Sequence, residues 1–245
     1  MLVKNLKLGE YMNTRQTNKN LVDFWEKALS LTEEEREELL KEKSLDYKDF
    51  VSSDKVYQAI LSLKECKNVL DYGCGSAWAS IILAKEGCTH IDALDMSDGI
   101  IDTAKFYTKL FNVEKQVQVS KITTDFKKSL KHGSYDGLVC INVLDIVTDE
   151  VSDEIIKFFH SALSLDAKII VGTNYYLSKE DAALKGIELE EGKYIFRDGI
   201  LRLNSLSNEE WKAKFLPYFE IEDIKYYAWP NEPKETRRIF YLKRK

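Results

Sequence analysis

The fold is decided by the stretch Val69-Leu70-Asp71-Tyr72-Gly73-Cys74-Gly75-Ser76-Ala77-Trp78-Ala79. Apolar residues and an acid lead into a Gly-x-Gly turn, and apolar residues at helical spacing follow. This pattern predicts a strand, a tight loop and a helix. Gly73 and Gly75 permit positive φ angles and let a ligand approach the backbone closely. In open α/β sheets, ligands bind at such loops beyond the carboxyl ends of the strands.

Two acids refine this expectation. A carboxylate of Asp71 aimed into the loop would repel a pyrophosphate and would accept a cation or a hydroxyl group, and the third glycine of the dinucleotide fingerprint is absent. Asp95 ends a second predicted strand about 20 residues after the loop, where an acid accepts hydrogen bonds from ribose hydroxyls. The sequence therefore disfavours a nicotinamide-dependent dehydrogenase and indicates a ligand that contains a ribose.

Strands and helices alternate along most of the chain, which predicts a doubly wound, Rossmann-like α/β domain with a parallel sheet. Residues 1–52 are expected to form an N-terminal helical cap, and residues 53–245 the main domain. An insertion at about 174–206 contains two β-prone runs around Asp198-Gly199, which predicts a β-hairpin. Strands are expected at 68–72, 90–95, 117–122, 134–144, 168–172, 221–229 and 237–243.

The glycine-rich stretch resembles the first motif of class I S-adenosylmethionine-dependent methyltransferases, roughly hydrophobic-hydrophobic-Asp/Glu-x-Gly-x-Gly-x-Gly. It matches at Val69, Leu70, Asp71, Gly73 and Gly75 and departs at residues 76–77, where many members carry a further glycine. By element order the resemblance extends over about residues 53–245. It implies a seven-stranded, mostly parallel sheet whose last strand is antiparallel beside the fifth, a β-hairpin lid, and S-adenosylmethionine as the cofactor.

The resemblance also implies which residues hold the cofactor. Asp95 would bind the ribose, Met96 would lie against the adenine, and Asn142 would face the ligand. Asp125 would accept the adenine amino proton and Phe126 would pack on the ring, although Asp125 also fits a helix cap. A bulky residue at Gly73 is expected to abolish binding while the chain still folds. The full predicted cofactor set is Asp71, Gly73, Cys74, Gly75, Asp95, Met96, Asp125, Phe126 and Asn142.

Fewer residues are candidates for binding the methyl acceptor, and they are chosen by their position in the sequence. Asp145 and Tyr175 are the candidate catalytic residues, to hold an amine or to position a nucleophile, and Asp145 fits a solvent-facing residue equally well. Candidate substrate residues are Tyr11, Trp25, Tyr176 and Arg197. Trp25 fits even better as a residue that only packs its helix against the rest of the protein. No metal site is predicted.

Composition limits the class of substrate. The net charge of −5 gives no overall basic field for nucleic acid, and an Asn/Asp-Pro-Pro-Tyr/Phe run and a Pro-Cys pair are both absent from the sequence. The four cysteines form no Cys-x-x-Cys pair, and no apolar run approaches the roughly 20 residues that span a bilayer. We therefore expect a cytoplasmic methyltransferase that acts on N or O of a small molecule, with no nucleic-acid or membrane partner. A non-catalytic cofactor-binding protein and a protein or RNA methyltransferase are the alternatives, and the oligomeric state is open.

Overall fold

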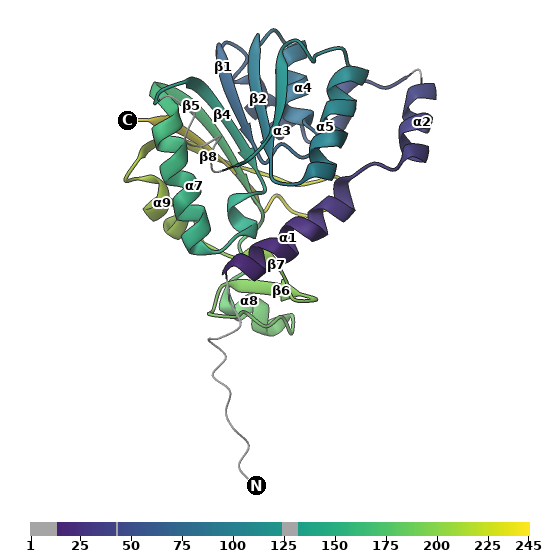
Figure 1. Ribbon diagram of the computed structural model, residues 1–245. Coiled ribbons are helices and arrows are strands. Elements are labelled where there is room, and N and C mark those ends of the chain that lie inside the picture. The colour runs from purple at the N-terminus through teal and green to yellow at the C-terminus, as the bar shows by residue number, and fades with distance from the viewer. Residues whose placement is uncertain (1–13, 43, 124–131) are drawn as a thin grey trace.

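The structure is a computed structural model that describes residues 14–42, 44–123 and 132–245 (Figure 1). Helices and strands alternate through most of it, as predicted. The described elements are α1 (Thr14–Leu29), α2 (Glu33–Lys41), η2 (Tyr47–Phe50), α3 (Asp54–Leu61), β1 (Asn68–Tyr72), α4 (Trp78–Lys85), β2 (His90–Asp95), α5 (Asp98–Leu110), β3 (Val117–Lys121), β4 (Tyr135–Ile141), η3 (Leu144–Ile146), α7 (Asp149–Ala162), β5 (Leu163–Thr173), α8 (Lys179–Leu184), β6 (Tyr194–Arg197), β7 (Ile200–Asn204), α9 (Asn208–Phe215), β8 (Phe219–Tyr227) and β9 (Arg237–Arg244).

Seven strands form the main sheet in the order β3-β2-β1-β4-β5-β9-β8. Strands β1 to β5 pair in parallel, whereas β9 is antiparallel to both β5 and β8. The last strand of the chain thus lies antiparallel beside the fifth, so the predicted fold class is confirmed. The strand order reverses between β1 and β4, and open α/β sheets bind ligands at such a switch point.

The sheet has an apolar layer on each face, which explains its nearly continuous apolar strands. Side chains alternate along β1, so that Val69 packs among α3, α4 and α5, whereas Leu70 packs against the α7 and α9 side. Figure 1 shows α3, α4 and α5 on one side of the sheet and α7 and α9 on the other. With both faces covered, the carboxyl edge is where the ends of the strands can face a site.

The N-terminal helices differ in how they attach to the domain. Helix α1 crosses the carboxyl edge of the sheet, between α5 and the β6–β7 hairpin (Figure 1). Its end is fixed because the Leu31 N–H donates to Thr103 Oγ1 (3.0 Å). Helix α2 begins with a capping box formed by Thr32 and Glu35, and it buries none of its residues. Only α1 is therefore placed to shape a site.

The predicted hairpin in the insertion is present as the two-stranded sheet of β6 and β7. Asp198 and Gly199 both have positive φ angles, 54° and 71°, as a tight primed turn requires. Both ends of the insertion meet at Arg238, which is 1% exposed. Its guanidinium donates to the carbonyls of Asn174 (Nη2, 2.9 Å) and Leu206 (Nη1, 2.7 Å). The insertion is therefore closed at its base by one buried side chain.

Candidate functional site

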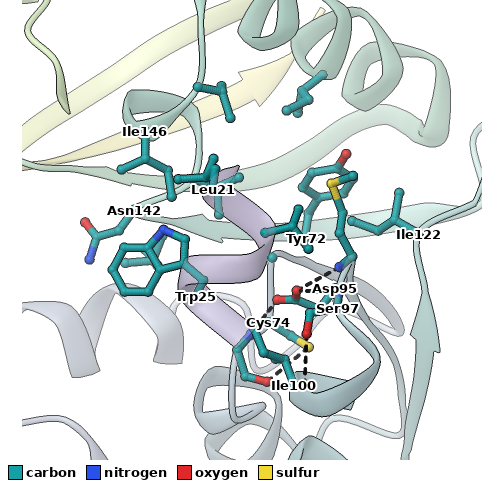
Figure 2. Close-up of a pocket in the computed structure, with 18 of the residues that line it drawn as sticks. Leu21, Trp25, Tyr72, Cys74, Asp95, Ser97, Ile100, Ile122, Asn142 and Ile146 are labelled. Atoms are coloured by element: carbon teal, nitrogen blue, oxygen red, sulfur yellow. Dashed lines mark hydrogen bonds between the residues drawn. The ribbon is translucent and has the colours of Figure 1, made fainter. Parts of the chain in front are cut away.

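A cavity of about 450 Å³ lies at the carboxyl ends of β1, β2 and β4, under helix α1 (Figure 2). Its lining is mostly apolar. The described residues around it are Leu21, Val22, Trp25, Leu29, Tyr72, Gly73, Cys74, Gly75, Trp78, Asp95, Met96, Ser97, Ile100, Ile122, Ile141, Asn142, Val143, Ile146, Val147, Val151, Glu154 and Ile155. The cavity thus lies at the switch point of the sheet and contains the glycine-rich loop.

The glycine-rich loop is tied to the neighbouring strand. The N–H groups of Gly73 and Cys74 both donate to the Leu94 carbonyl, at 2.8 and 2.9 Å. A Cβ on Gly73 would lie 2.3 Å from Cγ2 of Val143, whereas a Cβ on Gly75 would meet only Cδ1 of Leu29, at 3.9 Å. Gly73 is therefore required by packing inside the protein. Gly75 keeps the backbone open toward the cavity.

Asp95 lies on the cavity wall at the end of β2, as its spacing predicted. Its carboxylate accepts hydrogen bonds from the N–H groups of Gly75 (Oδ2, 3.1 Å) and Met96 (Oδ1, 2.7 Å) (Figure 2). Burial raises the pKa of Asp95, and the hydrogen bonds from backbone N–H groups oppose this rise. Each carboxylate oxygen has a second lone pair, so Asp95 can also accept from a ligand hydroxyl. Met96 is 49% exposed beside it and offers an apolar surface.

Asp71 differs from the expectation that its carboxylate is aimed into the loop. It is 3% exposed and does not line the cavity. Its Oδ2 accepts a hydrogen bond of 2.6 Å from Ser80 Oγ on α4. The side chain points back under the loop because alternation along β1 turns it toward the helix that follows. Asp71 therefore links β1 to α4, and any effect on a ligand passes through the loop.

The buried Asp71 predicts a pH dependence of stability. Burial raises its pKa to about 7, from an ordinary value of 3.8, while the Ser80 hydrogen bond lowers it. The folded protein therefore keeps a proton that the unfolded chain releases, and this contribution to the free energy of unfolding is lost as pH rises from about 4 to about 7. Asp71→Asn is expected to flatten this fall, measured by urea unfolding across that range.

Ser80→Ala provides the opposite change as a control. It removes a hydrogen bond that favours the charged carboxylate, so the pKa of Asp71 should rise and the fall in stability should continue to higher pH. Identical pH profiles for the wild type and Asp71→Asn would contradict the assignment.

Asn142 and Trp25 bring polar groups to the other part of the cavity. Asn142 follows β4 with a φ of 57°, a left-handed conformation that asparagine tolerates better than most residues. Trp25 comes from α1, with Leu21 and Leu29 one turn to either side on the same helical face. In Figure 2, Trp25 and Asn142 lie at the left of the view and Asp95 at the right. Trp25 is thus the predicted substrate residue that the structure brings to the cavity.

Four other candidates of the acceptor side do not line the cavity in the structure, which corrects their expected positions. Asp145 is fully buried, and it accepts hydrogen bonds from the N–H and Nδ2 of Asn174 (2.6 and 2.7 Å) at the base of the insertion. Tyr175 is half-buried, and Tyr176 and Arg197 are exposed; none of the three lines the cavity. Tyr11, Asp125 and Phe126 lie outside the described residues.

Helix α1 explains why the insertion does not reach the cavity. The Arg202 guanidinium of β7 lies 3.6 Å from the ring centre of Phe24, so the hairpin packs on α1. On its other side, α1 is held to the start of α5 because Ser97 Oγ donates to Glu26 Oε2 (2.6 Å). The helix therefore occupies the place over the cavity that the resemblance gave to the hairpin lid.

Several lining residues had no clear signal in the sequence. Leu21 and Leu29 lie on one face of the first helix with the predicted Trp25, a pattern that indicates an apolar helical face but not what it covers. Val143, Ile146 and Ile155 look like ordinary core residues. Cys74 does line the cavity, but burial raises the pKa of its thiol well above the usual range, so it stays protonated. In the described ranges there is no group of three His, Cys, Asp or Glu placed to hold a metal ion, and no helix suited to cross a membrane.

Comparisons with known proteins point to a methyltransferase domain. Residues 69–165 match the family model of a methyltransferase domain. The chain is 26% identical to a ribosomal protein L11 methyltransferase of Ruminiclostridium cellulolyticum over 156 residues, which cover 62% of this chain and 43% of that protein. It is 34% identical to a ubiquinone biosynthesis O-methyltransferase of Coxiella burnetii over 86 residues, 34% of each chain. The chain thus spans less than half the length of these two curated relatives.

Among solved structures, an S-adenosylmethionine dependent methyltransferase from Mesorhizobium loti shares the fold. It superposes with a TM-score of 0.60 at 16% identity, over 80% of this chain and 99% of that one. The fold and the cavity define a doubly wound cofactor-binding domain. The matched range contains the glycine-rich loop, Asp95 and Asn142, so this part of the chain is similar to a methyltransferase domain, and the fold is shared with an S-adenosylmethionine dependent methyltransferase. S-adenosylmethionine is the cofactor that this similarity implies.

Proposed function

We propose that the protein transfers a methyl group from S-adenosylmethionine to a nitrogen or oxygen atom of a small molecule. The observation that carries this proposal is the continuous cavity that runs from Asp95 and the glycine-rich loop to an apolar wall under α1. One part has the polar groups that a nucleoside needs. The other part is suited to an apolar acceptor.

The residues of the cavity fit the cofactor. Asp95 would accept hydrogen bonds from the ribose, Met96 would pack on the adenine, and the open backbone at Gly75 would lie against the rest of the molecule. Asn142 would lie where the two parts of the cavity meet. Asp125 and Phe126 remain proposed adenine contacts, and Asp71 would act only by holding the loop.

Methyl transfer places few demands on the protein. The acceptor atom forms a bond to the methyl carbon while the carbon–sulfur bond breaks, the electron pair stays on sulfur, and an acceptor O–H or N–H releases its proton. Alignment supplies most of the acceleration in such a displacement. In this chain the apolar wall and Trp25 would orient the acceptor and exclude water. Asp145, fully buried at the base of the insertion, and Tyr175 do not line the cavity and would act only through the packing of the insertion.

A protein substrate is the second candidate, because L11 methyltransferases are among the relatives. Helix α1 lies over the cavity and is held on both sides, which favours a small acceptor over a protein side chain. A non-catalytic cofactor-binding protein remains a third candidate. We also propose a boundary near residue 52 between cap and domain, and a cytoplasmic location, which the four buried free cysteines support.

The test is calorimetric titration with S-adenosylmethionine, S-adenosylhomocysteine and NAD. We expect micromolar binding of the first two and none of NAD. A screen of small-molecule acceptors with labelled methyl would follow, beside ribosomal protein L11. Lack of binding by both S-adenosyl compounds would contradict the proposal, and labelling of L11 alone would replace the small-molecule acceptor by a protein.

A further inference from the structure

We propose that Glu26 and Gly99 are positioning residues that hold helix α1 over the cavity, and that release of this attachment controls how fast S-adenosyl compounds enter and leave. The inference rests on the proposed function, because it concerns exchange of the proposed cofactor. Neither residue lines the cavity, so both would act through the position of α1.

Helix α1 covers the cavity with one of its faces. In Figure 2, this helix brings Leu21 and Trp25 to the cavity. The side chains of α1 that line the cavity are apolar or aromatic: Leu21, Val22, Trp25 and Leu29. A molecule bound in the cavity would therefore lie against α1, and the helix must move aside if such a molecule is to pass on this side.

Glu26 attaches α1 to the segment that follows β2. Ser97 Oγ donates a hydrogen bond of 2.6 Å to Glu26 Oε2, the short distance of a bond to a charged acceptor. Ser97 stands two residues after Asp95, whose Oδ1 accepts from the N–H of Met96 at 2.7 Å. Helix α1 is thus bonded to the same three-residue segment that supplies the proposed ribose and adenine contacts. Lifting α1 from the cavity must break the bond between Glu26 and Ser97.

Gly99 allows α1 to approach α5 closely at the same place. It lies in the first turn of α5 and has no positive φ, so its backbone conformation suits any residue, and alanine is the better helix former. A Cβ here would lie 2.3 Å from Oγ of Ser30 and 3.1 Å from Cγ of Glu26. The glycine is therefore explained by the contact with α1, and a side chain at this position would push Glu26 away from Ser97.

The contacts at the two ends of α1 differ in kind. Just after the helix, the backbone N–H of Leu31 donates to Thr103 Oγ1 of α5 at 3.0 Å. Toward its other end, Phe24 is held by the Arg202 side chain of the hairpin. When the bond between Glu26 and Ser97 opens, α1 would lift about residues 30–31 while the chain that follows stays on α5. Opening of such lids limits ligand release in many enzymes.

The test compares the binding rates and the affinity of S-adenosylhomocysteine. Stopped-flow tryptophan fluorescence measures association and dissociation, since Trp25 and Trp78 line the cavity, and calorimetry measures Kd. Glu26→Ala should raise both rates about 10-fold, the effect of one hydrogen bond to a charged group, and should leave Kd within about twofold. Gly99→Ala should change both rates in the same direction. A merely structural role of Glu26 would weaken the affinity instead.

Two variants of α1 serve as controls. Glu26→Gln keeps a side-chain oxygen that can accept from Ser97, so it should bring both rates back to within about threefold of the wild type. Asp23→Ala removes an exposed acid about one turn earlier on the same helix, and Asp23 does not line the cavity. This variant should leave both rates unchanged.

The outcomes separate the two proposals. If S-adenosylhomocysteine does not bind the wild type, the proposed function fails and this inference fails with it. If it binds, but Glu26→Ala leaves both rates unchanged, or Asp23→Ala raises them equally, only the inference is overturned. Faster dissociation in Glu26→Ala without faster association would show that Glu26 stabilises the bound state, and this too would overturn it.

Discussion

Replacing Gly73 by alanine is expected to lower the free energy of unfolding by about 2–4 kcal/mol. The added Cβ would lie 2.3 Å from Cγ2 of Val143, and the φ of 74° disfavours any residue with a side chain. Urea unfolding measures the change. The sequence alone led us to expect that a bulky residue at this position would spare folding. The structure adds a cost in stability to that expectation, since the first atom of any side chain already meets Val143.

Gly75→Ala is the matched control. Gly75 also has a positive φ, 54°, but an added Cβ would meet only Leu29 Cδ1, at 3.9 Å. The expected loss is about 1 kcal/mol from backbone strain alone. Val143→Ala combined with Gly73→Ala should recover part of the larger loss, because it removes the clashing methyl group. Equal stability losses at both glycines, without recovery in the double variant, would contradict the packing argument.

Asp95→Ala is expected to weaken binding of S-adenosylhomocysteine by about 1–3 kcal/mol, roughly 5- to 150-fold in Kd. The carboxylate would lose its contacts with the ribose, and the N–H groups of Gly75 and Met96 would lose the acceptor that now holds the loop. Titration calorimetry measures the affinity. Urea unfolding of the same variant shows whether the loop change also destabilises the protein.

Asp98→Ala is the matched control for Asp95. Asp98 carries the same charge on the first turn of α5, but its side chain is exposed and pairs with Lys121 at 2.6 Å. The cofactor affinity of this variant should stay within about twofold of the wild type, because surface ion pairs contribute little. An affinity that is unchanged in Asp95→Ala would remove Asp95 from the site.

The part of the cavity that we propose for the cofactor was largely predictable from the sequence. Gly75, Asp95 and Met96 follow strand ends, and the carboxyl ends of adjacent parallel strands meet at one edge of a sheet. A local pattern therefore places them without knowledge of distant contacts. The direction of the Asp71 side chain was harder to predict, because neighbouring residues of a strand point to opposite faces of the sheet. Its place beneath the loop depends on Ser80, nine positions later in the chain.

The acceptor part was not predictable in the same way. Tyr175, Tyr176 and Arg197 were chosen because the hairpin was expected to cover the site, whereas α1 lies over the cavity. Asp145 follows β4 as expected, but its carboxylate accepts a hydrogen bond from the N–H of Asn174. Whether a polar residue faces a ligand or another segment depends on contacts between elements far apart in the sequence. No local pattern encodes these contacts.

The sequence by itself determined the doubly wound fold, the glycine-rich loop, the acid at the end of β2 and the hairpin around Asp198-Gly199. Each follows from backbone conformation and apolar periodicity over a short window. Only the tertiary structure decided that α1 of the expected cap, and not the hairpin, lies over the cavity, and that Arg238 closes the insertion. These depend on long-range packing, which sets the surroundings of a side chain after its own element has formed.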